Sequence, residues 1–160
     1  MKIYTDGACR GNQYGNATGG YGVIIDSGSA RAEYAQGYAD TTNNRMELRA
    51  AIAGLKALTT PTQVELVTDS QYVSKAFTDN WIAGWLKRGW KNASGKPVKN
   101  RDLWEELIPL TEKHKVTWTW VRGHNGHPDN ERADELACMA ADNGPLLKDI
   151  GTTTLTAVTL

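Results

Sequence analysis

Four acidic residues lie where a folded chain could bring their carboxylates together. Asp6 and Asp69 each end a run of β-forming residues, whereas Glu47 and Asp134 lie within helical patterns. In open sheets, ligand crevices form beyond the carboxyl ends of the strands. A single aspartate at a strand end is more often a turn former or a helix cap. Four acids placed in this way nevertheless favour one shared site.

Carboxylates that share a crevice repel one another unless a cation neutralises them. Mg²⁺ is the expected cation, because oxygen ligands suit it and the sequence shows neither a Cys and His cluster nor the spacing of an EF-hand. Mn²⁺ could substitute for it. Four acids could hold two ions astride a phosphate, one activating water and the other stabilising the leaving oxygen.

A histidine lies in a glycine-flanked loop beside the proposed crevice. His124 is the first histidine of the segment RGHNGH, residues 122–127. An imidazole on a loop near acids can titrate close to neutral pH and move protons. A lone histidine is more often structural or simply exposed, so the residue type alone leaves both interpretations open.

Strands and helices must alternate along the chain to position these residues. Alternating β-forming residues predict strands over 2–5, 21–26, 31–38, 64–68 and 116–121. Apolar residues at helical spacing predict helices over about 43–58, 70–77, 102–113 and 128–143, with a further tryptophan-rich helix that begins near residue 80. This order implies an α/β fold with one mixed sheet and helices on its faces.

Length and composition set the remaining bounds. A chain of 160 residues, 40% of them apolar, is expected to form one domain over residues 1–150, followed by a flexible tail over 151–160. Trp104, Trp118 and Trp120 are assigned to the core. The sequence shows no signal peptide and no apolar run of membrane-spanning length, and its two cysteines are far apart. A cytoplasmic protein with reduced thiols and no membrane partner is therefore expected.

Five groups of motifs, in this order, resemble the signatures of bacterial type 1 ribonuclease H over about residues 1–150. They are TDGACRGN with GGYG, TTNNRMEL, TDSQYV, WLKRGWK with PVKNRDLW, and WVRGHNGHPDNERADELA. The resemblance implies a ribonuclease H-like fold with a five-stranded mixed sheet of order 3-2-1-4-5, its first three strands antiparallel. It also implies Mg²⁺-dependent endonucleolytic cleavage of the RNA strand of RNA–DNA hybrids by a monomer, leaving 3′-hydroxyl and 5′-phosphate ends.

The same resemblance assigns roles to single residues. It implies that the metal-binding acids are Asp6, Glu47, Asp69 and Asp134, and that His124 assists proton transfer or product departure. It further implies contacts to the hybrid from Cys9, Asn12, Thr42, Asn43, Asn44 and Gln71. Amide side chains both donate and accept hydrogen bonds, so they can bind the RNA 2′-hydroxyl and minor-groove base edges without demanding a sequence.

The charge of the chain is unevenly distributed. There are 18 Lys+Arg and 18 Asp+Glu in total, yet residues 86–101 carry six basic residues and no acidic one. This stretch matches the basic protrusion of the family, at about residues 80–101. Its expected contacts to the hybrid are Trp81, Trp85, Lys87, Arg88, Trp90 and Lys91. A tryptophan pair four residues apart is more often core, but interleaved cations favour a surface that packs on sugars and neutralises phosphates.

One departure from the family pattern concerns the loop after the first strand. Residues 13–19 form a slightly longer loop that lacks the usual Asn-Pro-Gly, which puts the position of Asn12, and hence affinity, in doubt. Two competing classes are a non-catalytic hybrid-binding module and another nuclease of the same fold, such as a junction resolvase or an integrase. The four acids and His124 speak against the first class. Neither class explains TTNNRMEL together with TDSQYV.

Overall fold

The centre of the molecule is a mixed sheet with the strand order β5-β4-β1-β2-β3-β6. The structure is a computed structural model that describes residues 1–11, 17–123 and 126–158. Antiparallel pairs join β1 (Lys2–Arg10), β2 (Thr18–Asp26) and β3 (Arg31–Ala39). Parallel pairs add β4 (Gln63–Thr68), β5 (Lys115–Trp120) and β6 (Leu146–Lys148). The predicted fold and order of the first five strands are confirmed, and β6 is an addition.

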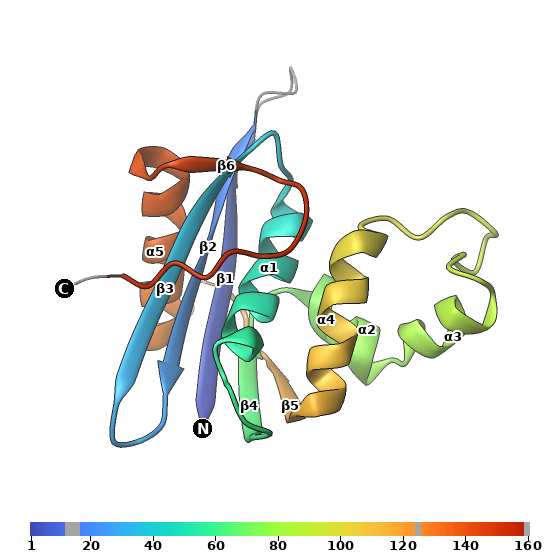
Figure 1. Cartoon of the computed structure of the whole chain (residues 1–160), viewed down its shortest axis with the longest axis horizontal. Coiled ribbons are helices and arrows are strands. Elements are labelled where there is room, and N and C mark those ends of the chain that lie inside the picture. Colours follow the sequence, from blue (N-terminus) through green and yellow to red (C-terminus); the bar gives the residue numbers. More distant parts are fainter. Residues whose placement is uncertain (12–16, 124–125, 159–160) are drawn as a thin grey trace.

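Helices cover both faces of this sheet (Figure 1). Helix α1 (Asn43–Lys56) packs on one face of β1 and β2, and α5 (Pro128–Asn143) covers the other face. The remaining helices are α2 (Gln71–Thr78), α3 (Trp81–Lys87) and α4 (Arg101–Lys113). Figure 1 shows α3 and the loop to α4 extending away from the sheet. Among the described residues, no helix has the length and apolar character needed to cross a membrane.

Two glycines let helix backbones approach the sheet closely. A Cβ atom on Gly7 would lie 2.4 Å from the amide nitrogen of Glu47 in α1. A Cβ atom on Gly22 would lie 2.1 Å from the carbonyl oxygen of Ala133 in α5. Any larger residue would push the helix away, so glycine is required by this packing. These contacts set how closely α1 approaches β1 and α5 approaches β2, and hence where Glu47 and Asp134, the neighbour of Ala133, are placed.

The tryptophans assigned to the core differ in their burial. Trp104 is fully buried, as predicted, and packs edge-on against Tyr72. Trp118 is half-buried and stacks on Phe77 of α2 with 4.6 Å between ring centroids. Trp120 is 43% exposed, so its assignment to the core is wrong. Trp120 lies at the end of edge strand β5, two residues beyond Trp118, on which Phe77 of α2 packs.

Residues 144–158 form a segment that we call the C-terminal strap. The sequence predicts a flexible tail from residue 151, but the described part of that tail is bonded to the fold. Its backbone exchanges hydrogen bonds with β3, from Ala35 N to Thr156 O and from Val158 N to Glu33 O. Figure 1 shows the strap, in red, running along β3, crossing α1 and returning to β3. A threonine-rich segment without helical period is thus held by long-range contacts.

Candidate active site

The register of β1 and β4 brings two of the predicted acids together. Thr5 of β1 pairs with Thr68 of β4, so Asp6 and Asp69 follow neighbouring positions of parallel strands. Beyond Asp69, Ser70 caps α2 by accepting a hydrogen bond from Val73 N at 3.2 Å. The chain therefore turns at Asp69, and the carboxylate lies at the carboxyl end of β4, where a crevice is expected.

Glu47 reaches the same point from α1. The amide nitrogen of Gly7 donates to Asp6 Oδ1 at 2.9 Å and to Glu47 Oε1 at 2.5 Å. Glu47 is only 4% exposed, and its second oxygen, Oε2, has no hydrogen-bond partner among the described residues. A buried carboxylate oxygen without a partner is costly unless a ligand satisfies it.

The three carboxylates lie close enough together to bind a cation. Asp6, Glu47 and Asp69 each offer an oxygen, and these oxygens lie within 4.8 Å of one another. Burial, and then the charge of Glu47, raises the pKa of Asp6 well above its ordinary value. Burial, and then the charge of Asp69, raises the pKa of Glu47. Among the residues that the structure describes, this cluster offers oxygen ligands alone, so the donor set fits Mg²⁺ or Mn²⁺.

The fourth predicted acid, Asp134, lines the same crevice from α5. The crevice has a volume of about 580 Å³ and is bounded by the ends of β1 and β4 and by α1, α2 and α5. Cys138, one helical turn after Asp134, places its Sγ 3.8 Å from Asp134 Oδ1. The structure thus brings all four predicted acids to one cavity.

The predicted contacts to the hybrid fall into three groups. Cys9, Asn43, Asn44 and Gln71 line the crevice. Thr42 is not among the residues that line the crevice; it is the N-cap of α1, where its hydroxyl accepts a hydrogen bond from the amide nitrogen of Arg45. Asn12 lies outside the described residues, and so does His124, which is predicted to assist proton transfer or product departure. Their roles therefore stay predictions.

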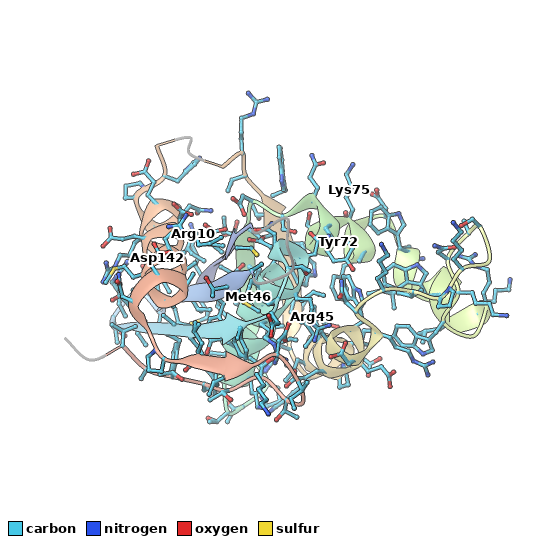
Figure 2. All side chains as sticks on the ribbon, turned by 90° about the horizontal axis from the view of Figure 1, so that it is seen from above. Arg10, Arg45, Met46, Tyr72, Lys75 and Asp142 are labelled. Carbon is cyan, nitrogen blue, oxygen red and sulfur yellow. The ribbon has the colours of Figure 1, made fainter. Side chains whose placement is uncertain are left out.

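Several residues that line the crevice were not predicted as site residues from the sequence, and three of them have large polar or reactive side chains. These three are Arg10, Tyr72 and Cys138. Figure 2 shows Arg10 beside Asp142, to which its guanidinium donates two hydrogen bonds of 2.8 and 2.7 Å. The strand period could have revealed Arg10, since Asp6, Ala8 and Arg10 share one face of β1. The helical period could have revealed Cys138 in the same way, four residues after Asp134.

The basic protrusion lies apart from the crevice and is only partly as predicted. The side chains of Lys87, Arg88 and Lys91 are exposed, and Trp81 is 38% exposed. Trp85 is only 8% exposed and packs edge-on against Trp104 with 5.1 Å between ring centroids. Trp90 is half-buried beneath the guanidinium of Arg101. Trp85 therefore anchors the protrusion to the core and offers little surface to a ligand.

An exposed tryptophan supports one of the acids. The indole nitrogen of Trp120 donates a hydrogen bond of 2.9 Å to the backbone oxygen of Asp69. Next along the chain, Val121 N donates to the carbonyl of Thr68 at 2.9 Å. The end of β5 thus fixes the backbone on which Asp69 is placed.

The sequence of the chain is similar to those of known proteins. The family model described as RNase H matches residues 1–142. A ribonuclease H of Lachnoclostridium phytofermentans is 57% identical over 154 residues, covering 93% of this chain and 96% of the relative. A ribonuclease H of Erythrobacter litoralis is 58% identical over 142 residues, covering 89% of this chain and 96% of the relative.

Solved structures show the same fold. The crystal structure of LC9-RNase H1, described as a type 1 RNase H with the type 2 active-site motif, is 35% identical with a TM-score of 0.79. The match covers 98% of this chain and 75% of that one. The solution structure of the PFV RNase H domain is 22% identical with a TM-score of 0.71, over 88% of this chain and 93% of that one. At that identity the second match supports the fold alone.

Proposed function

Because the chain belongs to the ribonuclease H family, we propose that the RNA strand of an RNA–DNA hybrid is hydrolysed in the crevice of Asp6, Glu47, Asp69 and Asp134. Two Mg²⁺ ions would serve the reaction, and the products would carry 3′-hydroxyl and 5′-phosphate ends. The observation that carries this proposal is the cluster of three carboxylate oxygens within 4.8 Å. One of them belongs to the buried Glu47, whose Oε2 has no hydrogen-bond partner among the residues that the structure describes.

The four acids would bind the metal ions, and hydrogen bonds that involve the backbone would fix the positions of the acids. Bound Mg²⁺ supplies an activated water and stabilises the charge that develops on the leaving oxygen. The Gly7 amide orients Asp6 and Glu47, and Trp120 fixes the backbone of Asp69. Asp69 or His124 would be nearest the attacking water and would accept its proton. His124 would also assist departure of the product.

The rim of the crevice would distinguish RNA from DNA. Asn43 and Asn44 at the start of α1, and Gln71 at the start of α2, face the cavity that the acids line. Their amides can both donate to and accept from a 2′-hydroxyl, which only the RNA strand carries. Cys9 and Asn12 would contribute contacts from the first strand and its following loop.

The basic protrusion would bind the DNA strand. Its exposed lysines and arginines can neutralise phosphates without reading sequence, with Trp81 packing on a sugar. Binding should therefore weaken steeply with added salt, although the formal net charge of the chain is zero. A flat salt dependence of hybrid binding, measured by fluorescence anisotropy, would argue against this role of the protrusion.

A cleavage assay with matched substrates tests the proposal. RNA labelled at one end is incubated with the protein and Mg²⁺ when annealed to DNA, annealed to RNA, and alone. Only the hybrid should be cut, and EDTA should stop the reaction. The products should be substrates for a 5′-phosphate-dependent exonuclease. Equal cleavage of all three RNAs would contradict the 2′-hydroxyl contacts, and products with 5′-hydroxyl ends would contradict the mechanism.

The active species is proposed to be a monomer. The crevice is lined by residues of a single chain, so a second copy is not needed to complete it. Light scattering coupled to size exclusion, at the concentration used for the cleavage assay, should give the mass of one chain. Activity found only in a dimer fraction would overturn this assignment.

A further inference from the structure

The C-terminal strap carries one buried acid that gathers several donors. The side chain of Asp149 is 4% exposed. Its Oδ2 accepts hydrogen bonds from Thr41 Oγ1 at 2.7 Å and from Arg45 Nε at 2.5 Å. Its Oδ1 accepts from Arg49 Nε at 2.8 Å and from Arg45 Nη2 at 3.2 Å. One carboxylate thus joins the strap to three residues on or just before α1.

The partners of Asp149 lie on both sides of the first turn of α1. Thr41 precedes the N-cap residue Thr42, and Arg45 follows Asn44. Between them, Thr42, Asn43 and Asn44 are exposed, and both asparagines line the crevice. Figure 2 shows Arg45 between α1 and α4. Asp149 therefore binds side chains on either side of the residues that would face the hybrid.

We infer that Asp149 is a positioning residue for hybrid binding, which fixes the start of α1 so that the Asn43 and Asn44 amides point into the crevice. The inference rests on the proposed function, because it concerns the same substrate. Asp149 itself contacts neither the acids nor the crevice, so it would act only through Thr41 and Arg45.

The first turn of α1 needs such support for a physical reason. Helix ends fray, and the N-cap bond from Arg45 N to Thr42 Oγ1 is long, at 3.3 Å. Although burial alone would raise it, the pKa of Asp149 is lowered because Arg45, Thr41 and Arg49 donate to the carboxylate. The ionised acid is thus the stable form, and its charge-assisted bonds are stronger than the N-cap bond.

Two variants weaken this support to different degrees. D149N keeps the shape of the side chain but removes its charge, while Arg45 keeps its pair with Asp102 of α4 at 2.8 Å. T41V removes only the hydroxyl that donates to Asp149 and leaves the ion pairs in place. T41V is therefore the variant that decides the outcome should D149N fail to fold.

A matched control removes a strap contact elsewhere. Glu106 of α4 accepts hydrogen bonds from Thr153 N at 2.8 Å and Thr153 Oγ1 at 2.8 Å. E106Q loosens the strap at that point without touching the start of α1. A role limited to stability predicts that E106Q and D149N behave alike, whereas a positioning role separates them.

The experiment measures kcat and KM on an RNA–DNA hybrid, together with hybrid binding in EDTA and thermal unfolding. D149N should raise KM about 5- to 10-fold and T41V about 2- to 3-fold, with kcat within about 2-fold of wild type. E106Q should lower the unfolding temperature but leave KM unchanged. Wild-type KM in T41V and in any folded D149N, or an equal rise in E106Q, would overturn the inference. Absence of cleavage by the wild-type protein would instead refute the proposed function, independently of the variants.

Discussion

Helix α1 carries two buried charged side chains, Glu47 and Arg49, whose surroundings differ: those of Glu47 carry like charge, and those of Arg49 carry opposite charge. Glu47 lies among like charges, and one of its carboxylate oxygens has no hydrogen-bond partner within the described part of the chain. Arg49, two residues further on, is completely buried but donates to Asp149 and Thr153 and stacks over Tyr38 at 4.6 Å. Buried charge that the protein itself leaves uncompensated thus marks a ligand site, whereas buried charge that is paired and hydrogen-bonded serves to hold the fold together.

The largest effect is expected where the uncompensated charge is removed. D6N keeps the size of the side chain but supplies no anionic oxygen to the metal. Cleavage of the hybrid should fall at least about 1,000-fold, while the far-ultraviolet circular dichroism spectrum stays that of the wild type. Full activity in D6N would refute a metal site at this cluster.

The compensated charge should matter for stability rather than chemistry. R49M leaves Asp149 buried without one of its two arginines, which should lower the free energy of unfolding by about 3 kcal/mol. The control is E105Q, because Glu105 pairs with Arg101 where both side chains are more than half exposed, and this change leaves Arg101 over the ring of Trp90. This surface pair should contribute no more than about 0.5 kcal/mol. Equal losses in urea unfolding of the two variants would break the distinction between the clusters.

The two clusters should also respond to pH in opposite directions. Burial and Glu47 raise the pKa of Asp6 in the folded metal-free protein, so the contribution of Asp6 to stability is greatest in acid and is lost as pH rises from the ordinary carboxyl value of about 4. The lowered pKa of Asp149 has the reverse sign, and its contribution is lost as pH falls below that value.

D6N isolates the first of these responses. In EDTA at pH 8 it should unfold with a free energy about 1 to 2 kcal/mol higher than the wild type, a difference that shrinks toward pH 4. Urea unfolding at several pH values measures this. A D6N protein that is no more stable than the wild type at pH 8 would show that the carboxylates do not strain the metal-free fold.

The smallest effect concerns the backbone beneath one acid. W120F removes the indole donor to the carbonyl of Asp69 but keeps an aromatic ring at an exposed position. The loss of one neutral hydrogen bond should lower kcat about 2- to 5-fold and raise the Mg²⁺ concentration needed for half activity. W118F, on the same strand but stacked on Phe77, should leave the Mg²⁺ dependence unchanged. A shared shift in both variants would point to the strand rather than to the bond.

The sequence predicted the elements whose signals are local. Residue periodicity identified the five longer strands and the main helices, because apolar faces recur at fixed spacing. β6 and the strap could not be found in this way. Asp149 of the strap binds Arg49, 100 residues earlier. Its neighbouring threonines lack any period, so only the folded partner reveals their place.

Prediction of the site succeeded where residue type and strand position agree. Asp69 directly follows β4 as predicted, whereas Asp6 lies in the middle of β1, because that strand continues along β2 beyond the end predicted at residue 5. Helical patterns placed Glu47 and Asp134 near them, and the motif resemblance supported all four acids. Trp120 was misassigned because its spacing from Trp118 indicates only that both side chains share one face of the strand. The spacing does not show how far along the strand the neighbouring helix covers that face. The burial of Trp85 depends on contact with Trp104, which no spacing rule predicts. His124 stays a prediction.

The C-terminal strap has a further consequence for solubility. Without residues 144–158, β3 would present an uncovered row of backbone donors and acceptors, because Gly37, Tyr38 and Ala39 now pair with β6 and Ala35 bonds to Thr156. Open strand edges of this kind template pairing between molecules. The strap thus closes one side of the sheet to other chains, and partial detachment during heating or storage would expose a nucleus for aggregation.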